Sequence, residues 1–210
     1  MTPSRRLLIT TGFTISSGAL GFAISEWIER RTIATSGATL PLRGIPGIGG
    51  PVRLTDHRRV RVDETTFQGK IQLVFFGFTS CPDVCPTALN LISDLLDRLG
   101  PDAAAFQPLF ITVDPERDTT EVMARYVEAF HPSIVGLTGT VEEIEGVASA
   151  FRAYFKKVPS QSGLGYVMDH TATIYVLDRQ GVFRATLDIH ESPDTSLEVL
   201  RRFTAPARGS

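Results

Sequence analysis

The stretch Ile71-Gln-Leu-Val-Phe-Phe-Gly-Phe-Thr-Ser-Cys-Pro-Asp-Val-Cys-Pro86 joins an apolar run to two closely spaced cysteines. The run is rich in β-forming residues, as expected of a central strand covered on both faces. From Ala88 to Leu99 the apolar residues then recur with helical spacing and fall on one helix face. The cysteines therefore sit at the carboxyl end of a strand, where open α/β sheets place their binding sites.

Further strands and helices are expected on both sides of this unit. Helices should begin at Asp118-Thr-Thr-Glu and Thr140-Val-Glu-Glu, which can act as capping boxes, and at Ser192-Pro, with proline at the first helical position. Asp178-Arg-Gln-Gly is expected to be a hairpin turn. The expected strands are 52–54, 60–62, 71–76, 109–113, 173–177 and 182–187.

The order of these elements predicts the fold class. Two strands precede a βαβα unit, and a short strand and helix, a β-hairpin and a last helix follow. A βαβ unit followed by a hairpin and a helix is the thioredoxin-like layout, so we predict an α/β, thioredoxin-like domain with an N-terminal β-hairpin over residues 52–205.

The N-terminal part of the chain predicts export. Arg5 and Arg6 precede an uncharged stretch, residues 7–25, which has about the length of a bilayer-spanning helix. Positive charge ahead of the stretch favours a cytoplasmic N-terminus. We expect residues 1–31 to be a signal or single-pass anchor in the inner (cytoplasmic) membrane, residues 32–51 to be a Gly- and Pro-rich linker, and the C-terminal domain to lie in the periplasm.

The net charge and the number of cysteines exclude two roles, nucleic-acid binding and a scaffold held by disulfides. A net charge of −2 with scattered arginines lacks the concentrated positive charge of a phosphate-binding surface, so no nucleic-acid partner is expected. Two cysteines can form only one disulfide within the chain, which is not a disulfide framework for a domain of this size. They point to a local chemical role.

Cys81 and Cys85 are four residues apart, which on a helical turn places both sulfurs on one face. At that spacing they can form a disulfide or bind a metal, and a helix N-terminus would lower the thiol pKa for either role. An inert disulfide is the plainest alternative. For a metal site, a third ligand must come from another part of the chain.

The chain has four histidines. His170 directly precedes the penultimate strand, a junction that faces the cysteine loop in a thioredoxin-like fold. His190, past a strand end, is a weak candidate or a loop residue. His57 is most simply a solvated loop residue, and His131 a helix-end residue favoured by the helix dipole.

Several runs resemble the Sco family, copper proteins needed to assemble cytochrome c oxidase. They are Phe75-Phe-Gly-Phe-Thr-Ser-Cys-Pro-Asp-Val-Cys-Pro-Thr87, Phe110-Ile-Thr-Val-Asp-Pro-Glu-Arg-Asp-Thr119, Gly136-Leu-Thr-Gly139 and Asp169-His170. The similarity spans about residues 50–204. It implies a thioredoxin-like fold with an N-terminal transmembrane anchor, and copper, as Cu(I) or Cu(II), bound by Cys81, Cys85 and His170.

The resemblance also implies a function. We expect a metallochaperone, not an enzyme, that delivers copper to the dinuclear site of cytochrome c oxidase subunit II. A thiol reductant and another periplasmic copper carrier are further expected partners. Asp83, Asp114 and Asp169 would shape the surroundings of the metal or a docking surface, although Asp114 and Asp118 could instead fix local turns and caps.

The alternative is a thiol–disulfide reductase in which Cys81 and Cys85 form a redox-active disulfide and keep the cysteines of subunit II reduced. Three residues separate the two cysteines, whereas thioredoxin-type motifs have two, and a histidine at the site also weighs against a general oxidoreductase. A peroxidase shares the fold, but the sequence has no Thr-x-x-Cys arrangement.

Overall fold

The structure is a computed structural model that describes residues 47–160 and 165–205. The predicted signal or membrane anchor, residues 1–31, and most of the predicted linker, residues 32–51, lie outside the described residues. Within the described part of the chain, no helix is both long and apolar enough to cross a membrane.

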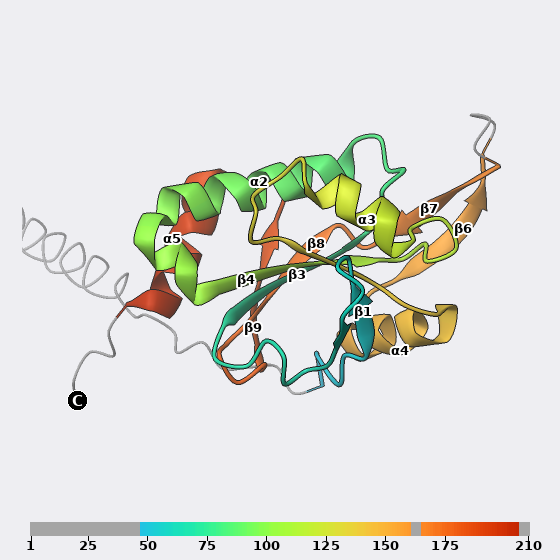
Figure 1. The fold of residues 1–210 in the computed structure, drawn as a ribbon. Helices are drawn as coiled ribbons and strands as arrows, with labels where there is room; N and C mark the ends of the chain where they lie inside the picture. Colours follow the sequence, from blue (N-terminus) through green and yellow to red (C-terminus); the bar gives the residue numbers. More distant parts are fainter. Residues whose placement is uncertain (1–46, 161–164, 206–210) are drawn as a thin grey trace, which may run out of the picture. The chain divides into compact units, whose positions relative to one another are not determined.

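A seven-stranded mixed sheet forms the centre of the domain, in the order β2-β1-β5-β4-β3-β8-β9 (Figure 1). Strands β3, β4 and β5 are parallel, and the outer strands pair antiparallel with their neighbours. The strands are β1 Leu54–Asp56, β2 Arg61–Val62, β3 Ile71–Gly77, β4 Phe106–Thr112, β5 Val135–Thr138, β8 Thr173–Leu177 and β9 Phe183–Asp188.

Helices cover both faces of this sheet. Figure 1 shows α2, α3 and α5 on one side of the sheet and α4 on the other. Every residue of β3 is buried between these layers, as its nearly continuous apolar run predicts. The helices are α2 Val84–Leu99, α3 Thr120–Val127, α4 Val141–Phe151 and α5 Pro193–Thr204, with a 3₁₀ helix at Gly100–Ala105.

The expected α/β class is confirmed, and the predicted strands and helices are present, most of them with shifted ends and the strand 173–177 with the predicted ends. The capping signals have mixed outcomes. Thr140 and Glu143 form both halves of a capping box, and Ser192 caps α5. The box expected at Asp118 is wrong: Thr119 caps α3 by accepting a hydrogen bond from Val122 N, whereas Asp118 is turned into the core.

One pair of strands was not predicted from the sequence. β6 (Phe155–Pro159) and β7 (Tyr166–His170) form a separate antiparallel ribbon, seen in orange beyond the main sheet in Figure 1. β6 carries two lysines and is mostly exposed, so it lacks the apolar pattern of a core strand. The ribbon matters for function because β7 ends at His170.

Candidate metal centre

The two cysteines lie at the end of β3, where the chain passes into α2. Cys81 lies in the connecting loop and is half-buried, whereas Cys85 is in the first turn of α2 and completely buried. Gly77, the last residue of β3, leaves the room that Cys85 needs. A Cβ atom on Gly77 would lie 2.7 Å from Cys85 Sγ.

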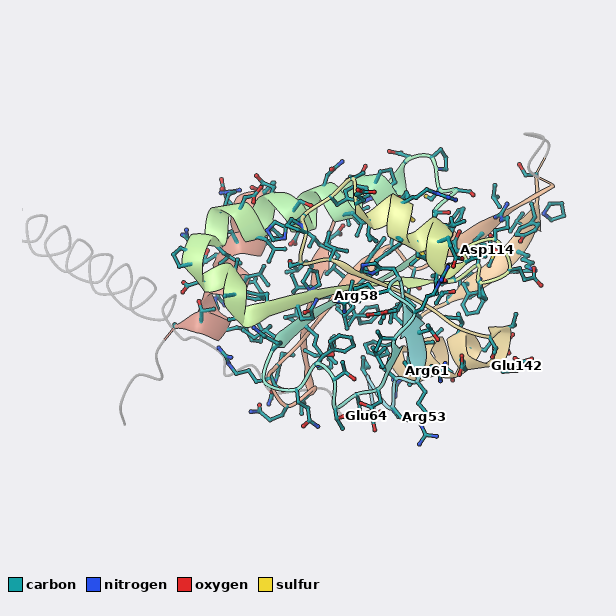
Figure 2. The ribbon with its side chains drawn as sticks, viewed as in Figure 1. Arg53, Arg58, Arg61, Glu64, Asp114 and Glu142 are labelled. Atoms are coloured by element: carbon teal, nitrogen blue, oxygen red, sulfur yellow. The ribbon has the colours of Figure 1, made fainter. Side chains whose placement is uncertain are left out.

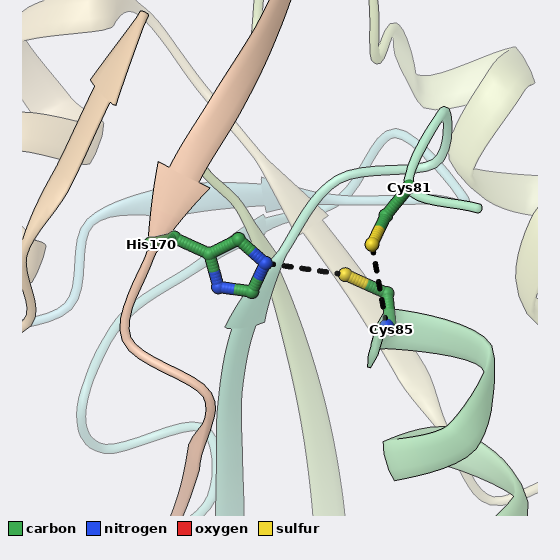
Figure 3. Close-up of side chains that lie close together, drawn as sticks. All are labelled: Cys81, Cys85 and His170. Atoms are coloured by element: carbon green, nitrogen blue, oxygen red, sulfur yellow. Dashed lines mark hydrogen bonds between the residues drawn. The ribbon is translucent and has the colours of Figure 1, made fainter. Parts of the chain in front are cut away.

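The expectation that both sulfurs share one helix face is wrong. α2 begins at Val84, so Cys81 precedes the helix. The loop instead folds back over the helix N-terminus, where the Cys85 amide donates a hydrogen bond to Cys81 Sγ at 3.4 Å (Figure 3). The free amides at a helix start favour negative charge at this position.

His170 completes the group from the opposite side (Figure 3). Its Nε2 atom lies 3.5 Å from Cys85 Sγ, and its Nδ1 atom lies 3.1 Å from the carbonyl oxygen of Thr171. A carbonyl only accepts hydrogen bonds, so a neutral ring has its proton on Nδ1 and directs the Nε2 lone pair at the cysteines. Phe75 and Phe78 pack edge-on to the imidazole ring and restrict its orientation.

The two thiols differ strongly in acidity. Hydrogen bonding from the Cys85 thiol lowers the pKa of Cys81 to about 4, against the opposing effect of burial. The same contact, together with burial, raises the pKa of Cys85. The metal-free pair therefore holds one thiolate, on Cys81, and one thiol, on Cys85. The expectation that the helix start lowers the pKa of both cysteines is wrong for Cys85.

The ligand atoms of Cys81, Cys85 and His170 all lie within 4.8 Å of one another. Among the described residues, no other group of three His, Cys, Asp or Glu side chains is arranged to hold a metal. Two sulfurs and one imidazole nitrogen form a soft donor set, of the kind that binds Cu(I) or zinc. Both cysteines are free, so the same pair is also available for a disulfide.

The other three histidines lie outside this group. His57 is not a solvated loop residue as expected: it is half-buried, and its Nδ1 atom accepts a hydrogen bond from the Gly136 amide. His131 bonds to Ser133 through Nδ1. His190 is exposed and belongs to the turn after β9.

The aspartates divide into surface and buried residues. Asp83 and Asp169 are exposed. Asp114 and Asp118 are both buried, and both belong to the loop between β4 and α3. Burial raises the pKa of Asp118, opposed by hydrogen bonds from Thr112 and Thr79. No local sequence pattern predicts these hydrogen bonds, because the threonine partners come from other segments of the fold.

Comparisons with known proteins agree with this geometry. The SCO1/SenC family model matches residues 42–205. The SCO2 homologue of Bos taurus mitochondria is 37% identical over 206 residues, which cover 97% of this chain and 76% of that protein. Human mitochondrial SCO1 is 43% identical over 145 residues, which cover 67% of this chain and 47% of that protein.

Solved structures give the same result. The copper-bound structure of ScoI from Bradyrhizobium japonicum is 45% identical, with a TM-score of 0.69, and covers 74% of this chain and 99% of its own. The copper-bound structure of yeast Sco1 is 35% identical, with a TM-score of 0.70, and covers 77% and 92%. The fold, the cysteine pair with its histidine, and these matches lead to one conclusion: this chain belongs to the SCO1/SenC family.

Proposed function

We propose that the reduced chain binds one copper ion through Cys81, Cys85 and His170 and delivers it to the dinuclear copper site of cytochrome c oxidase subunit II. The observation that carries this proposal is the convergence of two sulfurs and one imidazole nitrogen within 4.8 Å. Family membership supports it, because the related Bradyrhizobium japonicum and yeast proteins have copper-bound structures.

The donor set fits copper as a cargo. Thiolate ligands favour Cu(I), and two thiolates with one imidazole suit a three-coordinate ion. Cys85 is completely buried, whereas Cys81 and His170 are half-buried. An incoming thiolate from a partner can therefore reach the Cys81 and His170 side of the site and replace these ligands one at a time.

The N-terminal part of the chain would anchor this domain to the membrane, close to subunit II. We propose that residues 1–31 form the membrane anchor and residues 32–51 a linker, and that the domain from residue 52 to 205 works in the periplasm. Arg5 and Arg6 ahead of the uncharged stretch support this orientation. A thiol reductant and a periplasmic copper carrier would act before the transfer, because copper binding requires both cysteines to be reduced.

A second function is favoured by the unequal thiols. A half-buried Cys81 thiolate beside a buried Cys85 thiol is an arrangement suited to thiol–disulfide exchange. Cys81 would attack a disulfide of subunit II, and Cys85 would then displace the second cysteine of the partner. The partner gains two electrons, one proton from the Cys85 thiol and one proton from solvent; the Cys81–Cys85 disulfide forms, and an external dithiol must reduce it again.

One experiment separates the two functions. The reduced full chain, loaded with one equivalent of Cu(I), is incubated with the reduced, copper-free subunit II domain, and copper is measured in each protein after separation. The chaperone function predicts that copper is found in subunit II after incubation with the unmodified chain. It also predicts that His170→Ala transfers less copper to subunit II. In parallel, the copper-free chain is incubated with oxidised subunit II. If copper stays behind while the disulfide is reduced, the reductase function is correct.

A further inference from the structure

The loop of residues 114–118, between β4 and α3, contacts both segments that carry the cluster of Cys81, Cys85 and His170. Its ends are tied together, because the amides of Arg117 and Asp118 both donate to the Asp114 carbonyl, at 3.1 and 2.9 Å. The Asp114 amide also donates to Thr112 Oγ1 at 2.9 Å, which fixes the loop to the end of β4. The loop is therefore a compact turn fixed to the end of the buried strand β4.

One end of this loop holds the segment that leads to the cysteines. The completely buried carboxylate of Asp118 accepts hydrogen bonds from the Thr79 amide at 3.0 Å and from the Thr79 hydroxyl at 2.5 Å. A third hydrogen bond comes from Thr112 Oγ1 at 2.6 Å. Thr79 lies two residues before Cys81, so Asp118 fixes where the cysteine loop leaves β3.

The other end holds the β6–β7 ribbon. Tyr166 donates its hydroxyl hydrogen to Asp114 Oδ1 at 2.8 Å, and the Arg117 guanidinium lies 4.0 Å from the Tyr166 ring centroid. Arg117 also donates to the Tyr166 carbonyl at 3.2 Å and forms an ion pair with Asp114. On the opposite strand, Lys157 pairs with Glu116 of the same loop. Figure 2 shows Asp114 beside this ribbon.

Strand geometry carries this contact to His170. Tyr166, Met168 and His170 alternate along β7, so their side chains leave the same face of the strand. Met168, which lies between them, is buried, so this face of β7 packs against the rest of the domain. Within the described residues, the β6–β7 ribbon forms its own two-stranded sheet and pairs with no strand of the main sheet. Its position therefore depends on side-chain contacts such as those of Tyr166.

We propose that the 114–118 loop is a positioning element that sets the separation between the cysteine segment and His170, with Asp118 acting through Thr79, and Asp114 and Arg117 acting through Tyr166. This inference rests on the proposed copper function. Neither Tyr166 nor Thr79 binds the ion; each orients a segment that does. Contacts of this kind around metal ligands contribute substantially to metal affinity, since they fix the direction of the ligand atoms.

The test compares Tyr166→Phe in two backgrounds of the full chain. Tyr166→Phe keeps the aromatic ring and removes only the hydroxyl that bonds to Asp114. We expect Cu(I) affinity, measured by competition with a chelator, to fall about 10-fold when His170 is present. In the His170→Ala background the same change should leave the affinity unaltered, because no ligand remains on the ribbon to be misplaced. A general loss of stability would instead weaken both backgrounds.

Two further variants make the comparison specific. Tyr154→Phe is the matched control: Tyr154 is 53% exposed, adjoins β6, and its hydroxyl makes no hydrogen bond within the described residues. It should bind copper as the unmodified chain does. Thr79→Val removes the hydroxyl bond to Asp118, and its loss of affinity should persist in the His170→Ala background, because it acts through the cysteines.

A metal-free readout separates failure of this inference from failure of the proposed function. In the reduced chain without copper, NMR cross-relaxation between the His170 ring and the Cys85 β-hydrogens reports their proximity. Tyr166→Phe should weaken these cross-peaks, and Tyr154→Phe should not. If the chain binds no copper, the function fails while the cross-peaks still test the positioning. Cross-peaks unchanged in Tyr166→Phe, or an equal affinity loss in both backgrounds, would overturn the inference.

Discussion

Cys81 and Cys85 are chemically unlike, although only three residues separate them. Cys81 receives hydrogen bonds from the Cys85 thiol and amide, which hold its pKa at about 4. Cys85 is enclosed by apolar side chains and has a raised pKa. A metal ion must therefore displace a proton from Cys85, whereas Cys81 already presents a thiolate near neutral pH.

This difference predicts the reactivity of the metal-free chain. Iodoacetamide should alkylate Cys81 at a rate that stays nearly constant between about pH 6 and pH 8, because a thiol with a pKa of about 4 is already ionised there. In Cys85→Ala the main hydrogen bond to Cys81 is lost. The rate should then rise with pH toward the ordinary thiol pKa of about 8.5. Peptide mapping identifies the alkylated residue, and a rate that rises with pH in the unmodified chain would contradict this prediction.

Asp118 predicts an unusual pH dependence of stability. Burial raises its pKa above the ordinary value of 3.8. Between that value and the raised pKa, the folded chain binds more protons at this carboxyl than the unfolded chain does, so the stability it contributes falls as pH rises. The free energy of unfolding, measured against Asp118→Asn in denaturant from about pH 4 to pH 7, should favour the unmodified chain more at the acidic end. If the stability advantage of the unmodified chain over Asp118→Asn instead grew toward neutral pH, the pKa of Asp118 would not be raised in the folded chain.

At the scale of single residues, the sequence predicts ligands better than it predicts their surroundings. Cys81, Cys85 and His170 stand out by spacing, position and family resemblance. The partners of His57 and Asp118 do not, because Gly136 is 79 residues from His57 and Thr79 is 39 residues from Asp118. Such contacts depend on which strands become neighbours, which local pattern does not encode.

The same contrast holds for whole elements. The apolar run of β3 and the spaced apolar residues of α2 predict buried elements, and both are buried as expected. The β6–β7 ribbon was missed because β6 is mostly exposed and because polar contacts with Asp114, Arg117 and Glu116 hold much of the ribbon, so its apolar pattern is weak. Its signal in the sequence is only the turn-rich segment 159–165 between two short runs that contain β-formers.

The junction of β3 and α2 gives a prediction at this scale. In Gly77→Ala the new Cβ would lie 2.7 Å from both Cys85 Sγ and Phe110 Cε2, so the core must shift. We expect a loss of about 1–3 kcal/mol in the free energy of unfolding. Gly146→Ala is the matched control, because Gly146 lies within α4 with nothing within 4 Å of its new Cβ. It should gain about 0.5–1 kcal/mol from helix propensity.

Chemical denaturation of the three chains measures both effects. The Gly77→Ala loss should be accompanied by weaker copper binding, since Cys85 is displaced, while Gly146→Ala should bind copper normally. Equal stability of Gly77→Ala and the unmodified chain would mean that the strand end does not press against Cys85.

At the scale of the whole molecule, the fold brings together ligands that are far apart in the chain. Cys85 and His170 are 85 residues apart, yet their ligand atoms are 3.5 Å apart. β3 directs the cysteine loop to its carboxyl end, and β8 pairs with β3 just after the chain leaves His170. A site of this kind requires the complete sheet, so copper binding and folding should be coupled.

The copper stoichiometry of the reduced full chain is the first test of whether Cys81, Cys85 and His170 bind the ion. It is measured beside Cys81→Ala, Cys85→Ala and His170→Ala, with His190→Ala as a control because His190 is exposed and outside the cluster. We expect one tightly bound copper per chain, lost or sharply weakened in the three ligand variants and retained in the control. A reduced chain that binds no copper, or binds it equally well without His170, would contradict this expectation.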